Sequence, residues 1–165
     1  MMDLQKWSRQ QITNLIANYE RLNRTEGGRF TKAQAMLELE RRAGGDFDGS
    51  QVTQVILKIR DEAHDGIVRY RDIWSNYFPD QPWQGNNSGR IVGKALHAAA
   101  YYCATHRLPI VTALVTQAKG NMTDQAKNNM FEAAQNWGVA EGVSADEFYD
   151  INITALRSLR LEELP

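Results

Sequence analysis

Apolar residues recur at helical spacing along most of this chain. The clearest stripe lies between residues 50 and 64 and occupies positions i, i+3, i+4, i+7 and i+11. Its members are Val52, Val55, Ile56, Ile59 and Ala63. Side chains at this spacing share one face of an α-helix, and a helix of a globular protein buries such a face. The sequence therefore predicts a helix here whose apolar side belongs to the core.

The same periodicity predicts five further helices. Several of them begin at a capping box, in which a Ser or Thr is followed three residues later by Gln or Glu. The boxes pair Ser8 with Gln11, Thr31 with Gln34 and Ser144 with Glu147. Together with the glycines that follow four of the stripes and Pro109 after a fifth, they predict helices over residues 9–23, 31–43, 50–64, 90–106, 123–137 and 144–159.

Two segments have the pattern of β-strands. In residues 67–71, IVRYR, apolar and basic side chains alternate, as on a strand with one buried face. Residues 110–116, IVTALVT, are apolar and β-branched, which favours a buried strand. A buried strand without a partner would leave its backbone groups unpaired, at a cost in free energy. We therefore expect the two strands to pair with each other.

Between these segments, residues 75–90 are rich in Pro, Gly and amide side chains, a composition typical of a linker. The linker is placed at residues 79–90, between a half spanning residues 1–78 and another spanning residues 91–165. Its aromatic side chains suggest that it packs on a surface. The paired strands would then join both halves into one compact domain.

Three helices followed by a strand is the order found in winged helix-turn-helix proteins. Residues 9–72 resemble that family in this order, in the Phe30-Thr31 opening of the second helix, and in the DGIVRY sequence that leaves the third. The resemblance implies a winged-helix-like N-terminal half with a small sheet, followed by a helical C-terminal half. The expected fold class is thus α+β and predominantly helical.

The resemblance also implies that residues 50–64 form a recognition helix for double-stranded DNA. Gln can bond adenine edges, Thr can contact the thymine methyl group, and Lys or Arg can bind phosphates. The side chains expected to contact DNA are Gln51, Thr53, Gln54 and Lys58 on the helix, Arg69 and Arg71 on the wing, and Arg41 and Arg42 nearby. This pattern predicts a non-catalytic, sequence-selective DNA-associating protein of bacterial or phage type, acting in regulation or defence.

Other residues favour a protein partner. Leu57 falls on the predicted outer face of the helix, and the acids Asp61, Asp65 and Asp72 would repel phosphate. An alternative function is a protein-interaction module, such as an immunity or inhibitor protein. Its interface would contain Leu57, Tyr77, Phe78 and Trp83.

A third alternative is a metal-dependent nuclease. Asp80 after a proline, a later apolar strand, and Gln117 and Lys119 vaguely resemble the PD-(D/E)xK nucleases, whose acids bind a divalent cation. Gln117 replaces the second acid, however, and a neutral amide is a weaker ligand for a hard cation. His97, Cys103 and His106 do not share the spacing of a structural zinc site. We therefore predict no catalytic residue, metal or cofactor.

Composition and charge limit the partners and the cellular compartment that can be predicted. The formal net charge of the 165-residue chain is -1, so any contact with DNA must depend on a local basic patch. One cysteine excludes an internal disulfide and fits a reducing compartment. The N-terminus lacks the apolar segment of a signal peptide, and the apolar runs are shorter than the ~20 residues that a membrane helix needs. The sequence thus predicts a cytoplasmic protein and leaves its oligomeric state open.

Overall fold

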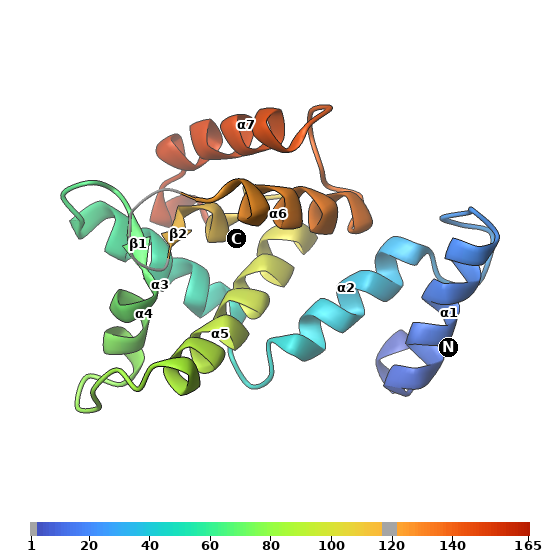
Figure 1. The fold of residues 1–165 in the computed structure, drawn as a ribbon, viewed down its shortest axis with the longest axis horizontal. Helices are drawn as coiled ribbons and strands as arrows, with labels where there is room; N and C mark the ends of the chain where they lie inside the picture. Colours follow the sequence, from blue (N-terminus) through green and yellow to red (C-terminus); the bar gives the residue numbers. More distant parts are fainter. Residues whose placement is uncertain (1–2, 117–121) are drawn as a thin grey trace.

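The computed structural model describes residues 3–116 and 122–165, and over these residues the fold is mainly helical (Figure 1). Its α-helices are α1 (Arg9–Arg21), α2 (Lys32–Ala43), α3 (Gly49–Glu62), α4 (Tyr70–Tyr77), α5 (Asn86–Thr105), α6 (Asp124–Asn136) and α7 (Ala145–Ser158). The strands are β1 (Val68–Arg69) and β2 (Val115–Thr116), and the short 3-10 helices are η1 (Leu4–Lys6), η2 (Val111–Leu114) and η3 (Leu161–Glu163). All six helices predicted from the sequence are confirmed, and α4 is an addition.

The capping boxes explain why the helix starts were predictable. The two complete boxes are Ser8 with Gln11 and Thr31 with Gln34, each with both reciprocal hydrogen bonds. At α7 only half of the box forms. The Ser144 hydroxyl accepts the backbone N–H of Glu147, while the Glu147 carboxylate accepts the N–H of Val143. Each cap satisfies a backbone donor that the helix leaves free and contributes about 1 kcal/mol.

The two predicted strands pair with each other, in parallel. Val68 lies opposite Val115, and Arg69 lies opposite Thr116. The ladder is much shorter than the sequence suggested, because residues 70–77 form α4 and residues 111–114, predicted as part of the second strand, form the 3-10 helix η2. The carboxylate of Asp72 accepts the backbone N–H of Arg69 at 2.9 Å, and this N-terminal cap starts the helix where the sequence predicted more strand.

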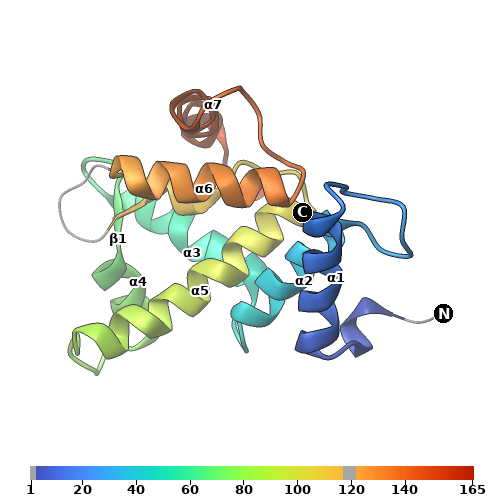
Figure 2. The same cartoon turned by 45° about the vertical axis from the view of Figure 1, so that its right-hand side comes forward.

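The main core forms around the contact between α3 and α5. Two glycines allow a close approach, since a Cβ at Gly44 would lie 2.9 Å from the Cα of Ala98, and one at Gly49 would collide with the Ala98 carbonyl oxygen. Figures 1 and 2 show α6 and α7 stacked on one side of this helix pair. Buried members of the core come from both halves of the chain and include Val52, Ile56, Ile73, Val92, Val111, Ala134 and Phe148.

A second, smaller cluster holds η1, α1 and α2 together, and we call these three elements the N-terminal unit. Its buried side chains are Leu4, Ile12, Ile16 and Ala35. In both figures α1 lies at the edge of the molecule, beyond α2. α3 packs on α5, and β1 joins a strand from the second half of the chain. The structure therefore does not confirm a winged helix-turn-helix in the N-terminal half.

One polar contact links α2 of the N-terminal unit to α5. Nδ1 of His97 lies 2.7 Å from Oε1 of Glu40. This hydrogen bond raises the pKa of His97, against the opposing effect of partial burial. The charged imidazolium is therefore favoured in the folded protein.

We expect Gly49→Ala to destabilise the protein, because the added methyl group would collide with the backbone of Ala98. The cost of overpacking is about 1–3 kcal/mol, and each kcal/mol lowers the Tm of a chain of this size by about 2–4 °C. Gly93→Ala is the matched control in α5, since nothing lies within 4 Å of its Cβ position. The control should be neutral or slightly stabilising. Equal Tm values for the two variants would contradict the close approach.

We also expect the His97–Glu40 contact to stabilise the fold more at acidic pH than at basic pH. The pKa of His97 is raised on folding, so the stabilisation is fully present below the unfolded-state value of about 6.5. It is lost as the pH rises through the folded-state pKa. Urea unfolding of the wild type and of His97→Gln, at pH values below and above the pKa of His97, measures the difference in their free energies of unfolding. If this difference does not become smaller as the pH rises, the stabilising role assigned to the His97–Glu40 contact is contradicted.

Candidate functional site

The orientation of α3 differs from the one its sequence predicted. The predicted stripe ran through Val52, Val55, Ile56 and Ile59, but the side chains fully buried against the core are Val52, Thr53, Ile56 and Leu57. Val55 and Ile59 are only partly buried. The contact with α5 turns the helix so that its inner face includes two residues expected outside.

Thr53 was predicted to contact a base, and this prediction is wrong. The side chain is 0% exposed, and its hydroxyl donates to the Gly49 carbonyl oxygen at 2.7 Å. That bond satisfies the buried hydroxyl within the helix itself, so a polar residue fits the core here. Its neighbour is Cys103, whose Sγ lies 3.9 Å away and whose pKa is raised by burial.

Leu57 was expected on the outer face as part of a partner surface, and this prediction is also wrong because its exposed fraction is 0%. The other three members of that surface, Tyr77, Phe78 and Trp83, are half-buried and pack against the main core. The rings of Phe78 and Trp83 contact Trp74, with centroid distances of 4.4 and 6.1 Å. These aromatic side chains cover the core instead of forming a separate exposed patch.

The outer face of α3 retains three of the predicted polar side chains. Gln51, Gln54 and Lys58 are exposed and follow one another at roughly one-turn intervals. The Gln54 amide makes one long contact, at 3.3 Å, with the Ser50 hydroxyl. No acid pairs with Lys58 among the residues that the structure describes. Their amide and ammonium groups are free to meet a partner.

Arg41 and Arg42 both pair with Glu38, a carboxylate that is only 5% exposed. Arg41 forms a two-point contact at 2.9 and 2.7 Å, and Nε of Arg42 donates at 2.8 Å. The Arg42 guanidinium also donates to the Trp7 carbonyl oxygen at 2.7 Å. Hydrogen bonding from Arg41 lowers the pKa of Glu38. Arg42 therefore ties α2 to the chain around η1, while Arg41 is paired within α2, and the expectation that both are free for phosphate is wrong.

The two arginines of the predicted wing have partners of their own. Arg69 donates to the Asp65 carboxylate at 2.8 Å, and this bond lowers the pKa of Asp65. The guanidinium of Arg71 lies 5.7 Å from the ring centroid of Trp83, a cation–π distance. Arg71 is exposed, so of the predicted DNA contacts only Gln51, Gln54, Lys58 and Arg71 are exposed and free of an ion pair.

The nuclease alternative receives no support from the described residues. Gln117 and Lys119 lie outside them, and Asp80 is exposed in the loop between α4 and α5. Across residues 3–116 and 122–165, no group of three or more His, Cys, Asp or Glu side chains could hold a metal ion. Cys103 is buried, while the ring of His106 lies against Tyr102.

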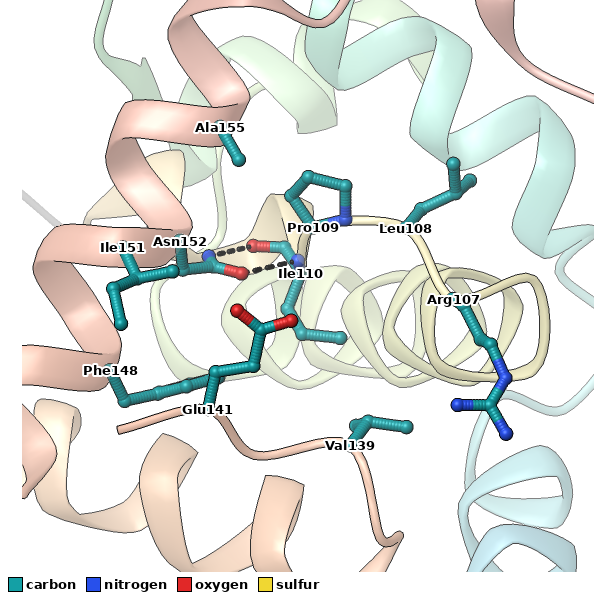
Figure 3. Close-up of a pocket in the computed structure, with 10 residues that line it drawn as sticks. All are labelled: Arg107, Leu108, Pro109, Ile110, Val139, Glu141, Phe148, Ile151, Asn152 and Ala155. Carbon is teal, nitrogen blue, oxygen red and sulfur yellow. Dashed lines mark hydrogen bonds between the residues drawn. The ribbon is translucent and has the colours of Figure 1, made fainter. Parts of the chain in front are cut away.

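A pocket that sequence analysis missed lies beside α7 (Figure 3), and we call it the α7 pocket. It has a volume of about 200 Å³ and is lined by residues 107–110, residues 139 and 141, and one side of α7. The Asn152 amide accepts the Ile110 N–H at 2.8 Å and donates to the Ile110 carbonyl at 2.9 Å. In the sequence, the pocket is indicated only by Asn152, a polar residue one helical turn after the buried Phe148 and therefore on the buried face of α7.

In the described part of the chain, no helix is long and apolar enough to cross a membrane. Comparison with known proteins finds no matching family model, no similar curated protein and no similar solved structure. Function is therefore inferred from the geometry and chemistry of the described residues.

We expect Thr53→Lys to unfold or strongly destabilise the protein, because it places an unpaired charge where Thr53 is fully buried. Such a change costs several kcal/mol. Gln54→Lys, one residue further along the same helix, should change stability by no more than about 0.5 kcal/mol, since Gln54 is exposed. Thermal unfolding followed by circular dichroism compares the two. A stable Thr53→Lys variant would show that α3 is oriented as its sequence first suggested.

Proposed function

We propose that this protein associates with double-stranded DNA, without catalysis, through the outer face of α3. The observation that carries the proposal is the row of exposed Gln51, Gln54 and Lys58 on a helix whose other side is fixed in the core. The resemblance of residues 9–72 to winged helix-turn-helix proteins supports the choice of α3 as the contacting helix. In this proposal the protein acts in regulation or defence, in the cytoplasm of a bacterium or in a phage context.

The chemistry of the row suits the major groove. A Gln amide presents a donor and an acceptor together, which matches the N6 and N7 edge of adenine, and a Lys ammonium binds phosphate as a point charge. A helix packed on one side keeps the backbone positions of these residues at fixed spacing, so binding has to order only their side chains. Recognition helices commonly contact bases with their N-terminal residues, and Gln51 and Gln54 lie in the first half of α3.

The charges around α3 limit the affinity that this proposal implies. Asp61 and Glu62 are exposed at the C-terminal end of the helix and would repel phosphate. Arg60 bonds to Asp61 at 2.7 Å, and Arg69 bonds to Asp65, so two nearby cations are already neutralised. In α3, all of which the structure describes, Lys58 is the one basic side chain without an ion pair. We therefore expect weak binding with a shallow salt dependence, because few counterions are released.

Lys58→Ala should weaken DNA binding for all sequences and reduce the slope of log K against log salt by about 1, because one phosphate contact is lost. Fluorescence anisotropy at several salt concentrations, with random and genomic duplexes, measures this slope. A double variant, Gln51→Ala with Gln54→Ala, should instead reduce the preference among sequences and leave the slope unchanged, since amides read bases and release no counterions.

The matched control is Lys6→Ala, which removes an exposed cation from η1 in the N-terminal unit. It should leave both affinity and slope at the wild-type values. An equal effect of Lys6→Ala would mean that only net charge matters. Absence of salt-dependent binding to any duplex at low salt would overturn the proposal, and a stoichiometric protein partner recovered without nucleic acid would favour the interaction-module alternative.

A further inference from the structure

We propose that the α7 pocket binds a small apolar group that carries an ammonium ion. The pocket is separate from the outer face of α3, and this inference does not depend on DNA binding. Ile110, Phe148 and Asn152 line it, together with residues of the two loops that approach α7 (Figure 3). Its volume of about 200 Å³ is enough for one aromatic ring or branched aliphatic group with a short polar head.

Oxygen acceptors with spare capacity gather at one place in this pocket. In Figure 3 the Glu141 carboxylate points toward the hydrogen-bonded pair of Asn152 and Ile110. No hydrogen bond or ion pair occupies the Glu141 carboxylate within the described residues. The Asn152 side-chain oxygen accepts one hydrogen bond, from Ile110, although an amide oxygen can accept two. A ligand with several N–H donors and a positive charge fits such a group.

Among the described residues, no cation of the protein pairs with the Glu141 carboxylate. Arg107 is the one basic residue that lines the pocket, and Figure 3 shows its guanidinium directed away from Glu141 and Asn152. Arg107 also has a positive φ of 54°, so its backbone lies in the left-handed region at the turn after α5. A neutral or anionic ligand would therefore face an uncompensated carboxylate at the Glu141 end of the pocket.

The rest of the lining selects an apolar body for the ligand. Leu108, Pro109 and Val139 face the space from the two loops, and Phe148, Ile151 and Ala155 face it from α7. Ile151 keeps 38% of its surface exposed where it lines the pocket. Covering such a side chain is favourable by about 25 cal/mol for each Å² removed from water. Two sources share this chemistry: a free apolar amine, and the N-terminus of a peptide that begins with an apolar residue.

Isothermal titration calorimetry tests the proposal with phenethylamine as the probe. Phenethylamine should bind, whereas N-acetylphenethylamine, which has the ring without the charge, and methylammonium, which has the charge without the ring, should bind at least about tenfold more weakly. Chemical shifts of the Ile110 backbone amide and the Asn152 side-chain amide report whether the ligand occupies this pocket. A short peptide with an N-terminal phenylalanine, with and without N-acetylation, distinguishes a peptide end from a free amine.

Glu141→Gln should weaken phenethylamine binding by about tenfold, because it removes a charge-assisted hydrogen bond. The protein should still fold, since Glu141 is exposed. Glu132→Gln is the matched control: Glu132 is an exposed acid in α6 that does not line the pocket, and binding should stay at the wild-type value. Ile151→Ser should weaken binding through the apolar wall. Equal binding of the acetylated compound, no effect of Glu141→Gln, or no binding of any probe would each overturn the proposal.

Discussion

The close approach of α3 and α5 at Ala98 is the constraint on which the rest of the structure depends. It exists because Gly49 in α3 has no side chain to collide with α5, and Gly44 at the end of α2 allows the preceding chain to approach the same residue. Once α3 lies this close, its inner face is wide enough to include Thr53 and Leu57. The same contact leaves Gln51 and Gln54 on the exposed face of the helix. One pair of small residues thus decides both the core and the surface that is available to a partner.

Several basic side chains that looked available for a ligand in the sequence are paired with acids of the protein itself. A sequence reveals that Arg41 and Arg42 are adjacent to each other, and an adjacent pair of arginines suggests a phosphate site. In the fold both turn toward the nearly buried Glu38, whose carboxylate would otherwise be left without a cation. Arg69 is likewise within reach of Asp65, four residues earlier. Because these arginines are paired with acids, the surface around them is closer to neutral than the number of basic residues in the sequence suggests.

Local signals made most of the fold predictable. Capping boxes and helical stripes gave the positions of six helices because these signals depend on residues within one or two turns. The pairing of the two strand segments followed from backbone hydrogen bonding, but their length did not. The Asp72 carboxylate accepts the backbone N–H of Arg69 and so starts a helix where the strand would have continued. The alternation of apolar and basic side chains does not indicate where such a helix begins. The orientation of α3 was also inaccessible, because it depends on glycines that are 40 or more positions from their contacts in α5.

The candidate site was less predictable than the fold for the same reason. Exposure of Gln51, Gln54 and Lys58 was correctly expected, whereas Thr53 and Leu57 were misplaced because α3 packs on a distant helix. The arginine pair was misplaced because Glu38 lies one turn earlier in the same helix and the Trp7 carbonyl oxygen accepts from Arg42. The α7 pocket left almost no trace in the sequence, since its walls come from three separate stretches of chain.

Asn152 has one more consequence for that pocket. Its amide copies the hydrogen bonding of a neighbouring strand, so Ile110 is held by two directional bonds instead of by packing alone. The wall formed by the loop and α7 is therefore preorganised before any ligand arrives. A preorganised wall loses little conformational entropy on binding, which leaves more of the contact energy as affinity. Asn152 thereby holds this short loop with the same pair of backbone hydrogen bonds that a neighbouring β-strand would supply.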